Sequence, residues 1–122
     1  MTASQKRNLV VIRHAPYGSG LSRAAVDAAL AMAAFEQPVT VLFLGDGVLQ
    51  LVPSQDSQRI GLKNIGRLLA SFPLYGIEQV YADAQALRRY GMDPLAAPVS
   101  TVPLECDAVR ALLCGHDHLL GF

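Results

Sequence analysis

The stretch IEQVYADAQALRRYGMDP, residues 77–94, contains one complete strand-to-helix unit of an α/β fold. Its first part, residues 77–82, reads as a strand, and the run then breaks at Asp83 into a helix-like segment, residues 84–90, which Gly91 ends. In an open parallel α/β sheet, ligands and reactive groups lie outside the carboxyl ends of the strands. Asp83 is therefore the first position at which to look for chemistry.

Two other segments predict strands that are buried on both faces. The runs LVVIR (residues 9–13) and VTVLFL (residues 39–44) are almost continuously apolar and rich in β-branched residues, which is typical of a parallel sheet covered by helices. Between them, residues 22–37 predict a helix with Ser22 as its N-cap and Pro38 as its stop. Its apolar residues recur at helical spacing: Val26, Ala29, Leu30 and Ala33.

The rest of the chain continues the same alternation. We expect one or two helical turns at residues 48–52 and an amphipathic helix at 65–72. A fourth strand is expected at 99–104, a short helix at 107–113 and a fifth strand at 118–122. Pro103 indicates a boundary or edge position for the fourth strand, and Asp107 is the expected cap of the last helix. The pattern predicts a single domain over residues 1–122, a three-layer, flavodoxin-like α/β fold with a mostly parallel five-stranded sheet.

Composition restricts the possible partners. The 122 residues include ten Lys+Arg and ten Asp+Glu, so the net charge is zero and the chain lacks the overall basic charge of a nucleic-acid-binding or membrane-binding protein. The apolar share of 52% and the charged share of 16% compare with about 45–50% and about 25% in typical domains, which favours a buried subunit interface over an Ala-rich core alone.

No segment predicts export or membrane insertion. The polar N-terminus has no apolar signal-peptide core, and the apolar helix candidate at residues 24–35 is too short to span a bilayer. We therefore expect a cytoplasmic protein. In that compartment its two cysteines, Cys106 and Cys114, do not form a disulfide framework.

The first strand-to-helix loop suggests two kinds of phosphate chemistry. Gly18 and Gly20 lie where phosphate-binding loops lie, but Arg23 stands where the third glycine of such a motif would be. The string VVIRHAP resembles the start of the histidine phosphatase superfamily, whose Arg-His pair would correspond to Arg13 and His14. The later Gly115-His116 pair resembles the segment that carries the second histidine of that family, although few residues remain to complete its fold. A phosphatase stays open as an alternative.

The carboxyl-terminal cysteine and histidines do not make a complete metal site. Cys114, His116 and His118 alternate and would share one face of a strand, but a fourth ligand is not evident, so we expect no metal and no cofactor. Cys106 precedes a predicted helix N-terminus, where a thiol pKa falls, although a small buried hydrophobe is the commoner role of such a cysteine.

Six strings resemble the DsrE/DsrF-like family of sulfur relay proteins, and within it the TusC (DsrF) subunits. They are APYGSGLSRAAVDAAL (15–30), FLGDGVLQLVPSQ (43–55), FPLYGIEQVY (72–81), ALRRYGMDP (86–94) and LECDAVRALL with HDHLLGF (104–113 and 116–122). The GDGVLQLVP string followed later by GIEQ is the most specific part. The resemblance covers nearly the whole chain.

This resemblance implies a subunit of a heterohexamer built from two copies each of three related chains, the partners being TusB- and TusD-type subunits. Such a complex passes persulfide sulfur to a downstream acceptor protein, toward 2-thiolation of the wobble uridine of certain tRNAs. A homologous complex in sulfur oxidisers works with dissimilatory sulfite reductase, and this pathway remains an alternative. The chain itself is not expected to bind nucleic acid.

In the active subunit of the family, the sulfur-carrying cysteine follows the third strand. Asp83 stands at that position here, and a carboxylate cannot carry a persulfide. The resemblance therefore implies a non-catalytic subunit, with Cys106 and Cys114 as the remaining thiols. The interface candidates are apolar residues after the second strand and before the third: Val48, Leu49, Leu51, Val52, Phe72, Leu74 and Tyr75. Each of them would also suit the core of the chain.

Overall fold

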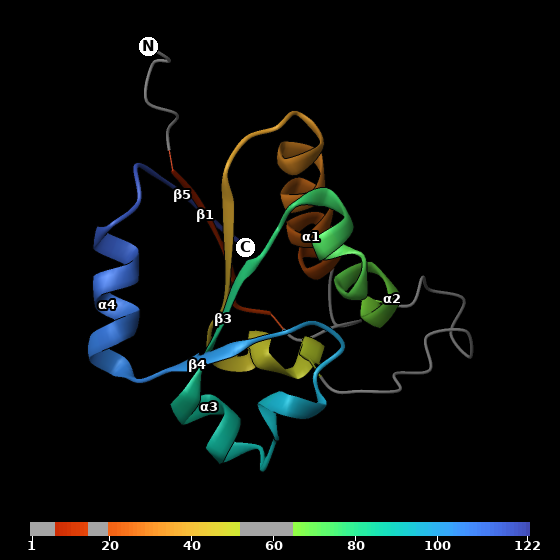
Figure 1. The fold of residues 1–122 in the computed structure, drawn as a ribbon. Coiled ribbons are helices and arrows are strands. Elements are labelled where there is room, and N and C mark those ends of the chain that lie inside the picture. Colours follow the sequence, from red (N-terminus) through yellow and green to blue (C-terminus); the bar gives the residue numbers. More distant parts are fainter. Residues whose placement is uncertain (1–6, 15–19, 52–64) are drawn as a thin grey trace.

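The computed structural model describes residues 7–14, 20–51 and 65–122 (Figure 1). Its centre is a five-stranded sheet in the order β4-β3-β2-β1-β5, and every neighbouring pair of strands is parallel. The strands are β1 (Asn8–Ile12), β2 (Val39–Phe43), β3 (Gln79–Asp83), β4 (Val102–Leu104) and β5 (His118–Gly121). The predicted α/β class and the predicted five-stranded sheet are confirmed.

Within the described residues, four α-helices connect the strands: α1 (Gly20–Ala34), α2 (Ile65–Ala70), α3 (Ala84–Arg89) and α4 (Cys106–Cys114). The same ranges contain three short 3₁₀ segments: η1 (Gly45–Leu51), η3 (Phe72–Tyr75) and η4 (Pro94–Ala96). Among the helices of the described ranges, none combines the length and the apolar character that crossing a membrane requires.

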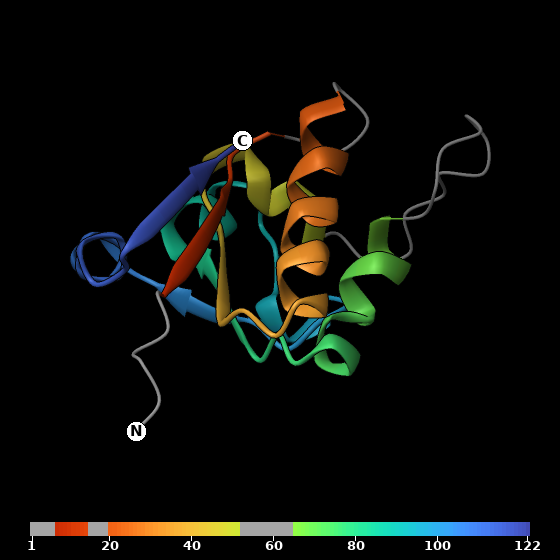
Figure 2. The same cartoon turned by 90° about the horizontal axis from the view of Figure 1, so that it is seen from above.

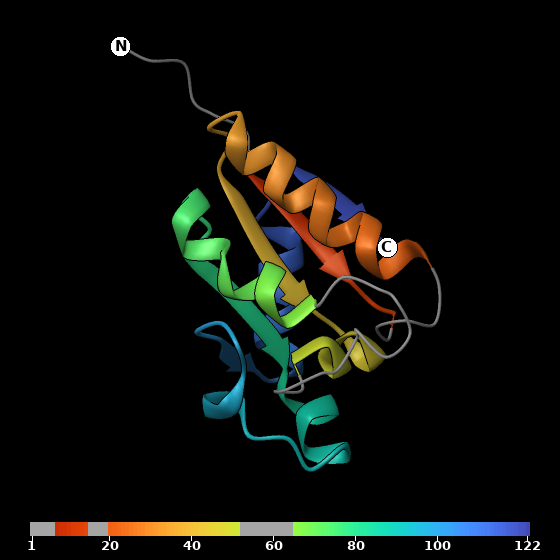
Figure 3. The same cartoon turned by 90° about the vertical axis from the view of Figure 1, so that its right-hand side faces the viewer.

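The strand order differs from the 2-1-3-4-5 order of flavodoxin. Here β2, β3 and β4 follow one another on one side of β1, and β5 returns to its other side. Because crossovers between parallel strands are right-handed, steps in one direction place their helices on one face, and the return step places α4 on the opposite face. Figures 2 and 3 show α1 and α2 along one face of the sheet, and Figure 2 shows α4 across from them.

Alternation along the strands divides the apolar side chains between the two faces. Val10 and Ile12 of β1 belong to the larger cluster, which also takes in side chains of α1, α2 and α3. Leu9 and Val11 belong to a smaller cluster closed by Val109 of α4. Strand β1 is buried over its whole length, which explains its continuous apolar sequence.

Two predicted helix caps are wrong. Helix α1 begins at Gly20, two residues before Ser22. Helix α4 has Glu105 at its N-cap, and Asp107 lies in its first turn, where a carboxylate interacts favourably with the helix dipole. The predicted edge position of Pro103 is confirmed, since it lies in β4 at one margin of the sheet.

The backbone at the start of η1 lies directly against the backbone at the carboxyl end of β1. A Cβ atom built on Gly47 would lie 1.9 Å from the carbonyl oxygen of Ile12, so only glycine fits. The same oxygen accepts a hydrogen bond from the backbone N–H of Leu44 at 2.9 Å. Gly47 therefore lets the chain leave β2 and pack directly against the end of β1.

We expect Gly47→Ala to lower the free energy of unfolding by at least about 2 kcal/mol, because the added methyl group must displace backbone atoms. Urea denaturation followed by circular dichroism measures this change. Ser100→Ala, an exposed position, is the control and should stay within about 0.5 kcal/mol of the unaltered chain. Equal stability of the two variants would contradict the close contact.

Candidate functional site

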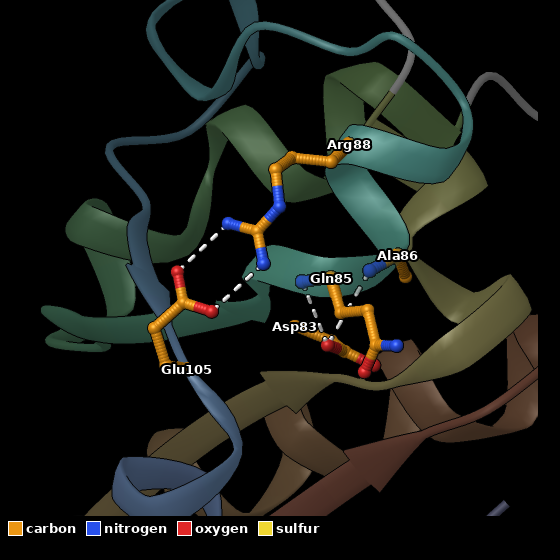
Figure 4. A network of polar contacts seen from close by, with 5 residues as sticks. All are labelled: Asp83, Gln85, Ala86, Arg88 and Glu105. Carbon is orange, nitrogen blue, oxygen red and sulfur yellow. Dashed lines mark hydrogen bonds and ion pairs between the residues drawn. The ribbon is translucent and has the colours of Figure 1, made fainter.

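Asp83 ends β3 and forms the N-cap of α3. Its Oδ1 accepts hydrogen bonds from the backbone N–H groups of Gln85 at 3.1 Å and Ala86 at 3.4 Å (Figure 4). Its Oδ2 accepts a hydrogen bond from the backbone N–H of Gly45 at 3.3 Å. One half-buried carboxylate therefore joins the start of α3 to the turn that follows β2.

The location of Asp83 is a topological switch point of the sheet. Strand β3 leads into α3, which packs with the α1 side of the core, whereas the neighbouring β4 leads into α4 on the opposite face. In open α/β sheets the crevice outside such a pair of strand ends is where ligands bind. Asp83 and Leu104 are paired across these two strands, so α3 and α4 both begin at this end of the sheet.

An ion pair connects the two helices at this point. Glu105, the N-cap residue of α4, accepts hydrogen bonds at 2.8 Å from both terminal nitrogens of the Arg88 guanidinium (Figure 4). This hydrogen-bonded pairing lowers the pKa of Glu105 and raises the pKa of Arg88. Both side chains are about two-thirds exposed, so the pair orients the helices more than it stabilises them.

Helix α3 is also attached at its other end. The hydroxyl of Tyr90, the C-cap residue, donates a hydrogen bond to the carboxylate of Asp46 in the first turn of η1. This hydrogen bond raises the pKa of the Tyr90 phenol. Because Asp83 bonds to Gly45, the two ends of α3 contact adjacent residues of one turn. Neither this contact nor the ion pair was predicted from the sequence, in which the acidic GDG turn at 45–47 was the available signal.

The chemistry of the Asp83 position is that of an acceptor. An ionised carboxylate accepts hydrogen bonds and carries no transferable sulfur, and its oxygens are already used by three backbone N–H groups. Its interactions are those of a structural cap.

The two cysteines lie at opposite ends of α4. Cys106 is its first residue and Cys114 its last, which places them about 12 Å apart along the axis. Both thiols are free and exposed, so the interpretation of Cys106 as a buried hydrophobe is wrong. Cys106 lies two residues beyond Leu104, the pairing partner of Asp83, and so shares the end of the sheet at which the crevice opens.

The interface candidates divide into two groups. Val48, Leu51 and Phe72 are at most 1% exposed and belong to the chain's own core, which is the alternative that the sequence left open for them. Leu74 is 87% exposed and Tyr75 48% exposed. Leu49 is half-buried. Val52 lies outside the described residues.

The residues of the phosphatase alternative are not brought together. Arg13 and His14 follow the carboxyl end of β1, whereas His116 lines an open groove of about 550 Å³ at the amino ends of the strands, beside Arg7. The length of β1, about 17 Å, separates these ends, so His14 and His116 cannot act on one phosphoryl group. Of the glycines proposed for phosphate binding, Gly20 starts α1 and Gly18 lies outside the described residues.

The residues once considered for metal binding are also dispersed. Cys114 ends α4, His118 starts β5, and the Nδ1 atom of His116 lies 2.8 Å from the carbonyl oxygen of Leu112. In the described part of the chain, no group of three or more His, Cys, Asp or Glu side chains is placed to hold a metal ion.

Comparison with known proteins gives consistent matches. The sequence model of the DsrE/DsrF-like family matches residues 6–122. The chain is 36% identical to Protein TusC of Escherichia coli over 118 residues, which is 96% of this chain and 99% of that protein. It is 33% identical to a TusC homolog of Pseudomonas aeruginosa over 112 residues, 92% of this chain and 94% of that protein.

The fold has a solved counterpart as well. The crystal structure of the ychN protein from E. coli superposes with a TM-score of 0.84 over 98% of this chain and 100% of that chain. The two sequences are 19% identical, so this likeness concerns the fold.

We expect Asp83→Ala to lower the free energy of unfolding by about 1–2 kcal/mol, because the cap of α3 and the bond to Gly45 are both lost. Asp83→Asn keeps one carbonyl acceptor and should lose less. Chemical denaturation measures both. Asp93→Ala is the control, since Asp93 caps only the short η4 through the N–H of Leu95. Equal losses for Asp83→Ala and Asp93→Ala would refute the joining role.

We expect the Tyr90 phenol to ionise above the ordinary tyrosine range, since the carboxylate of Asp46 holds its proton and raises its pKa. Ultraviolet titration of phenolate absorbance, with the Tyr90→Phe variant subtracted, isolates this residue among four tyrosines. Asp46→Asn should return the pKa toward its ordinary value. If that substitution left the titration unchanged, the hydrogen bond would not be the cause.

Proposed function

The chain belongs to the DsrE/DsrF-like family, and we propose that it acts as the TusC-type, non-catalytic subunit of a multi-subunit sulfur relay complex. The single observation that carries this proposal is the hydrogen bonding of the Asp83 carboxylate. At the position expected for a sulfur carrier, this chain has a carboxylate that accepts three backbone N–H groups. The sulfur is then carried by the cysteine of a partner subunit.

Sulfur transfer of this kind needs a thiolate. The thiolate attacks the terminal sulfur of a donor persulfide, the sulfur–sulfur bond of the donor breaks, and the donor leaves as a thiolate. Asp83 offers no such atom. The contribution of this chain is a rigid crevice edge, in which α3 is tied at both ends to the turn after β2 and to α4 through Arg88 and Glu105.

The proposed partners are related TusB- and TusD-type subunits in a heterohexamer, with this chain contributing one domain over residues 1–122. Leu74 and Tyr75 of η3 supply an exposed apolar contact for such a partner. Permanent subunit interfaces are more apolar than ordinary protein surface, which suits these side chains. The complex would pass sulfur to a downstream acceptor protein and toward 2-thiolation of the wobble uridine of tRNA, without direct tRNA contact by this chain.

Cys106 supports a second candidate, that of a sulfur carrier in its own right. It is exposed, it lies at the first position of α4, and it shares the carboxyl end of the sheet with Asp83. The free backbone N–H groups at a helix N-terminus interact favourably with a negatively charged group. Cys114 is the last residue of α4 and therefore does not lie at a helix N-terminus.

The test is co-expression with the two related subunits, followed by gel filtration with mass detection. Persulfide mapping by mass spectrometry then locates the sulfur after a persulfide donor is supplied. We expect a stable hetero-oligomer with added sulfur on a partner's cysteine and none on Cys106 or Cys114. The same assay with the downstream acceptor of either pathway separates tRNA thiolation from sulfur oxidation.

The double variant Cys106→Ser/Cys114→Ser is the matched control. It removes every thiol of this chain, and it should leave sulfur transfer through the complex within twofold of the unaltered rate. Loss of transfer in Cys106→Ser but not in Cys114→Ser would establish the carrier alternative. A chain that stays apart from both related subunits would refute membership of the complex.

A further inference from the structure

The two edge strands of the sheet differ in how well they are protected against pairing with a strand of another chain. At one margin, β4 has three residues and includes Pro103, which has no N–H to donate. Strand β5 forms the other margin of the sheet (Figure 2). It has the sequence HLLG, and all four of its residues are exposed. This strand contains no lysine, proline or acidic residue of the kind that protects edge strands.

The backbone groups at the open side of β5 can be assigned residue by residue. The N–H of His118 bonds to Arg7, the N–H of Phe122 bonds to Val11, and the carbonyl oxygen of Phe122 accepts from Arg13. Alternate residues of a strand direct their N–H and C=O groups to the same side. Residues 118, 120 and 122 therefore face β1, and Leu119 and Gly121 direct their backbone groups outward.

The side chains of β5 are apolar on both faces of the sheet. Leu119 is paired with Leu9 and lies on the α4 face, where it is 51% exposed. Leu120 is paired with Val10 and lies on the α1 face, where it is 39% exposed. Gly121 has no side chain, and a Cβ atom built there would have the Arg13 guanidinium as its nearest neighbour, at 3.9 Å. Whatever covers this edge must supply backbone partners and apolar contacts on both faces.

We propose that the occupant of this edge is β5 of a second copy of this chain, paired antiparallel across a two-fold axis. With Leu120 opposite Leu120 of the other copy, Leu119 of each copy stands opposite Gly121 of the other. This symmetric register satisfies the outward N–H and C=O groups of both residues in both copies. The two sheets join into one continuous sheet of ten strands, twice the five of one chain.

The side chains fit the same register. Leu120 meets its symmetry mate on the α1 face, which covers two half-exposed leucines with each other. Leu119 extends over Gly121 of the other copy, where the missing side chain leaves room on the α4 face. A self-complementary patch of this kind is what a two-fold interface requires. The inference goes beyond the proposed function, because it concerns contact between two copies of this chain and needs no sulfur transfer.

Disulfide trapping tests the register. In the Cys106→Ser/Cys114→Ser background, Leu120→Cys introduces a single thiol. In the proposed pair the two Cα atoms at position 120 lie about 4.5 Å apart, within the range of a disulfide. We expect mild oxidation to give a covalent dimer. Leu119→Cys is the matched control on the same strand, since its two copies are offset by two residues and lie about 8 Å apart, beyond disulfide reach. Leu95→Cys, 91% exposed and remote from β5, controls for random collision.

Two measurements on the unaltered chain test the proposal without relying on the folding of a cysteine variant. Gel filtration with mass detection should give twice the 13.0 kDa of one chain. Amide hydrogen exchange by NMR should show protection at Leu119 and Gly121 that is lost in Leu120→Lys. A monomer with fast exchange at both amides would overturn the proposal. So would equal cross-linking at 119, 120 and 95, or a cross-link at 120 that forms only with a co-expressed related subunit.

Discussion

The carboxylate of Asp83 is the contact on which the arrangement at the carboxyl ends of the strands depends. It accepts the first free N–H groups of α3 with one oxygen and the N–H of Gly45 with the other. A buried or half-buried helix start needs such a partner, because unpaired N–H groups away from water are costly. With Tyr90 bonded to Asp46, α3 is held at both ends against the turn after β2. The pair of Arg88 and Glu105 extends this connection to α4.

This arrangement shows how a carboxylate at the end of β3 supports the start of α3, at the position where the resemblance to the family leads us to expect a sulfur carrier in an active subunit. The helices that follow β3 and β4 lie on opposite faces because of the strand order. The residue at the end of β3 then decides whether this position carries a nucleophile or a helix cap. A carboxylate at that place strengthens the local structure and removes the thiol, which fits a supporting subunit in the proposed complex.

The two margins of the sheet point to where such a subunit makes contacts. The margin at β4 is short and contains a proline, whereas β5 carries outward backbone groups with leucines on both faces. The many apolar residues of this small chain thus fall into two groups. Val48, Leu51 and Phe72 are buried in the core, whereas Leu74, Leu119 and Leu120 are exposed. Sequence alone left the choice between core and interface open for candidates such as Val48 and Leu74, because apolar character is common to both.

The sequence determined by itself the class of the fold, the strands and helices in their order, and the presence of Asp83 at the end of a strand. These follow from local periodicity and from steric rules that act within a few residues. The tertiary structure decided the strand order, which departs from flavodoxin because β5 alone lies on the far side of β1, where flavodoxin has β2, and it decided the distance between His14 and His116. It also decided that Cys106 is exposed and that Gly45, Asp46 and Glu105 contact residues of α3 or of its two caps. These facts depend on contacts between residues far apart in the chain, which packing creates and local pattern does not encode.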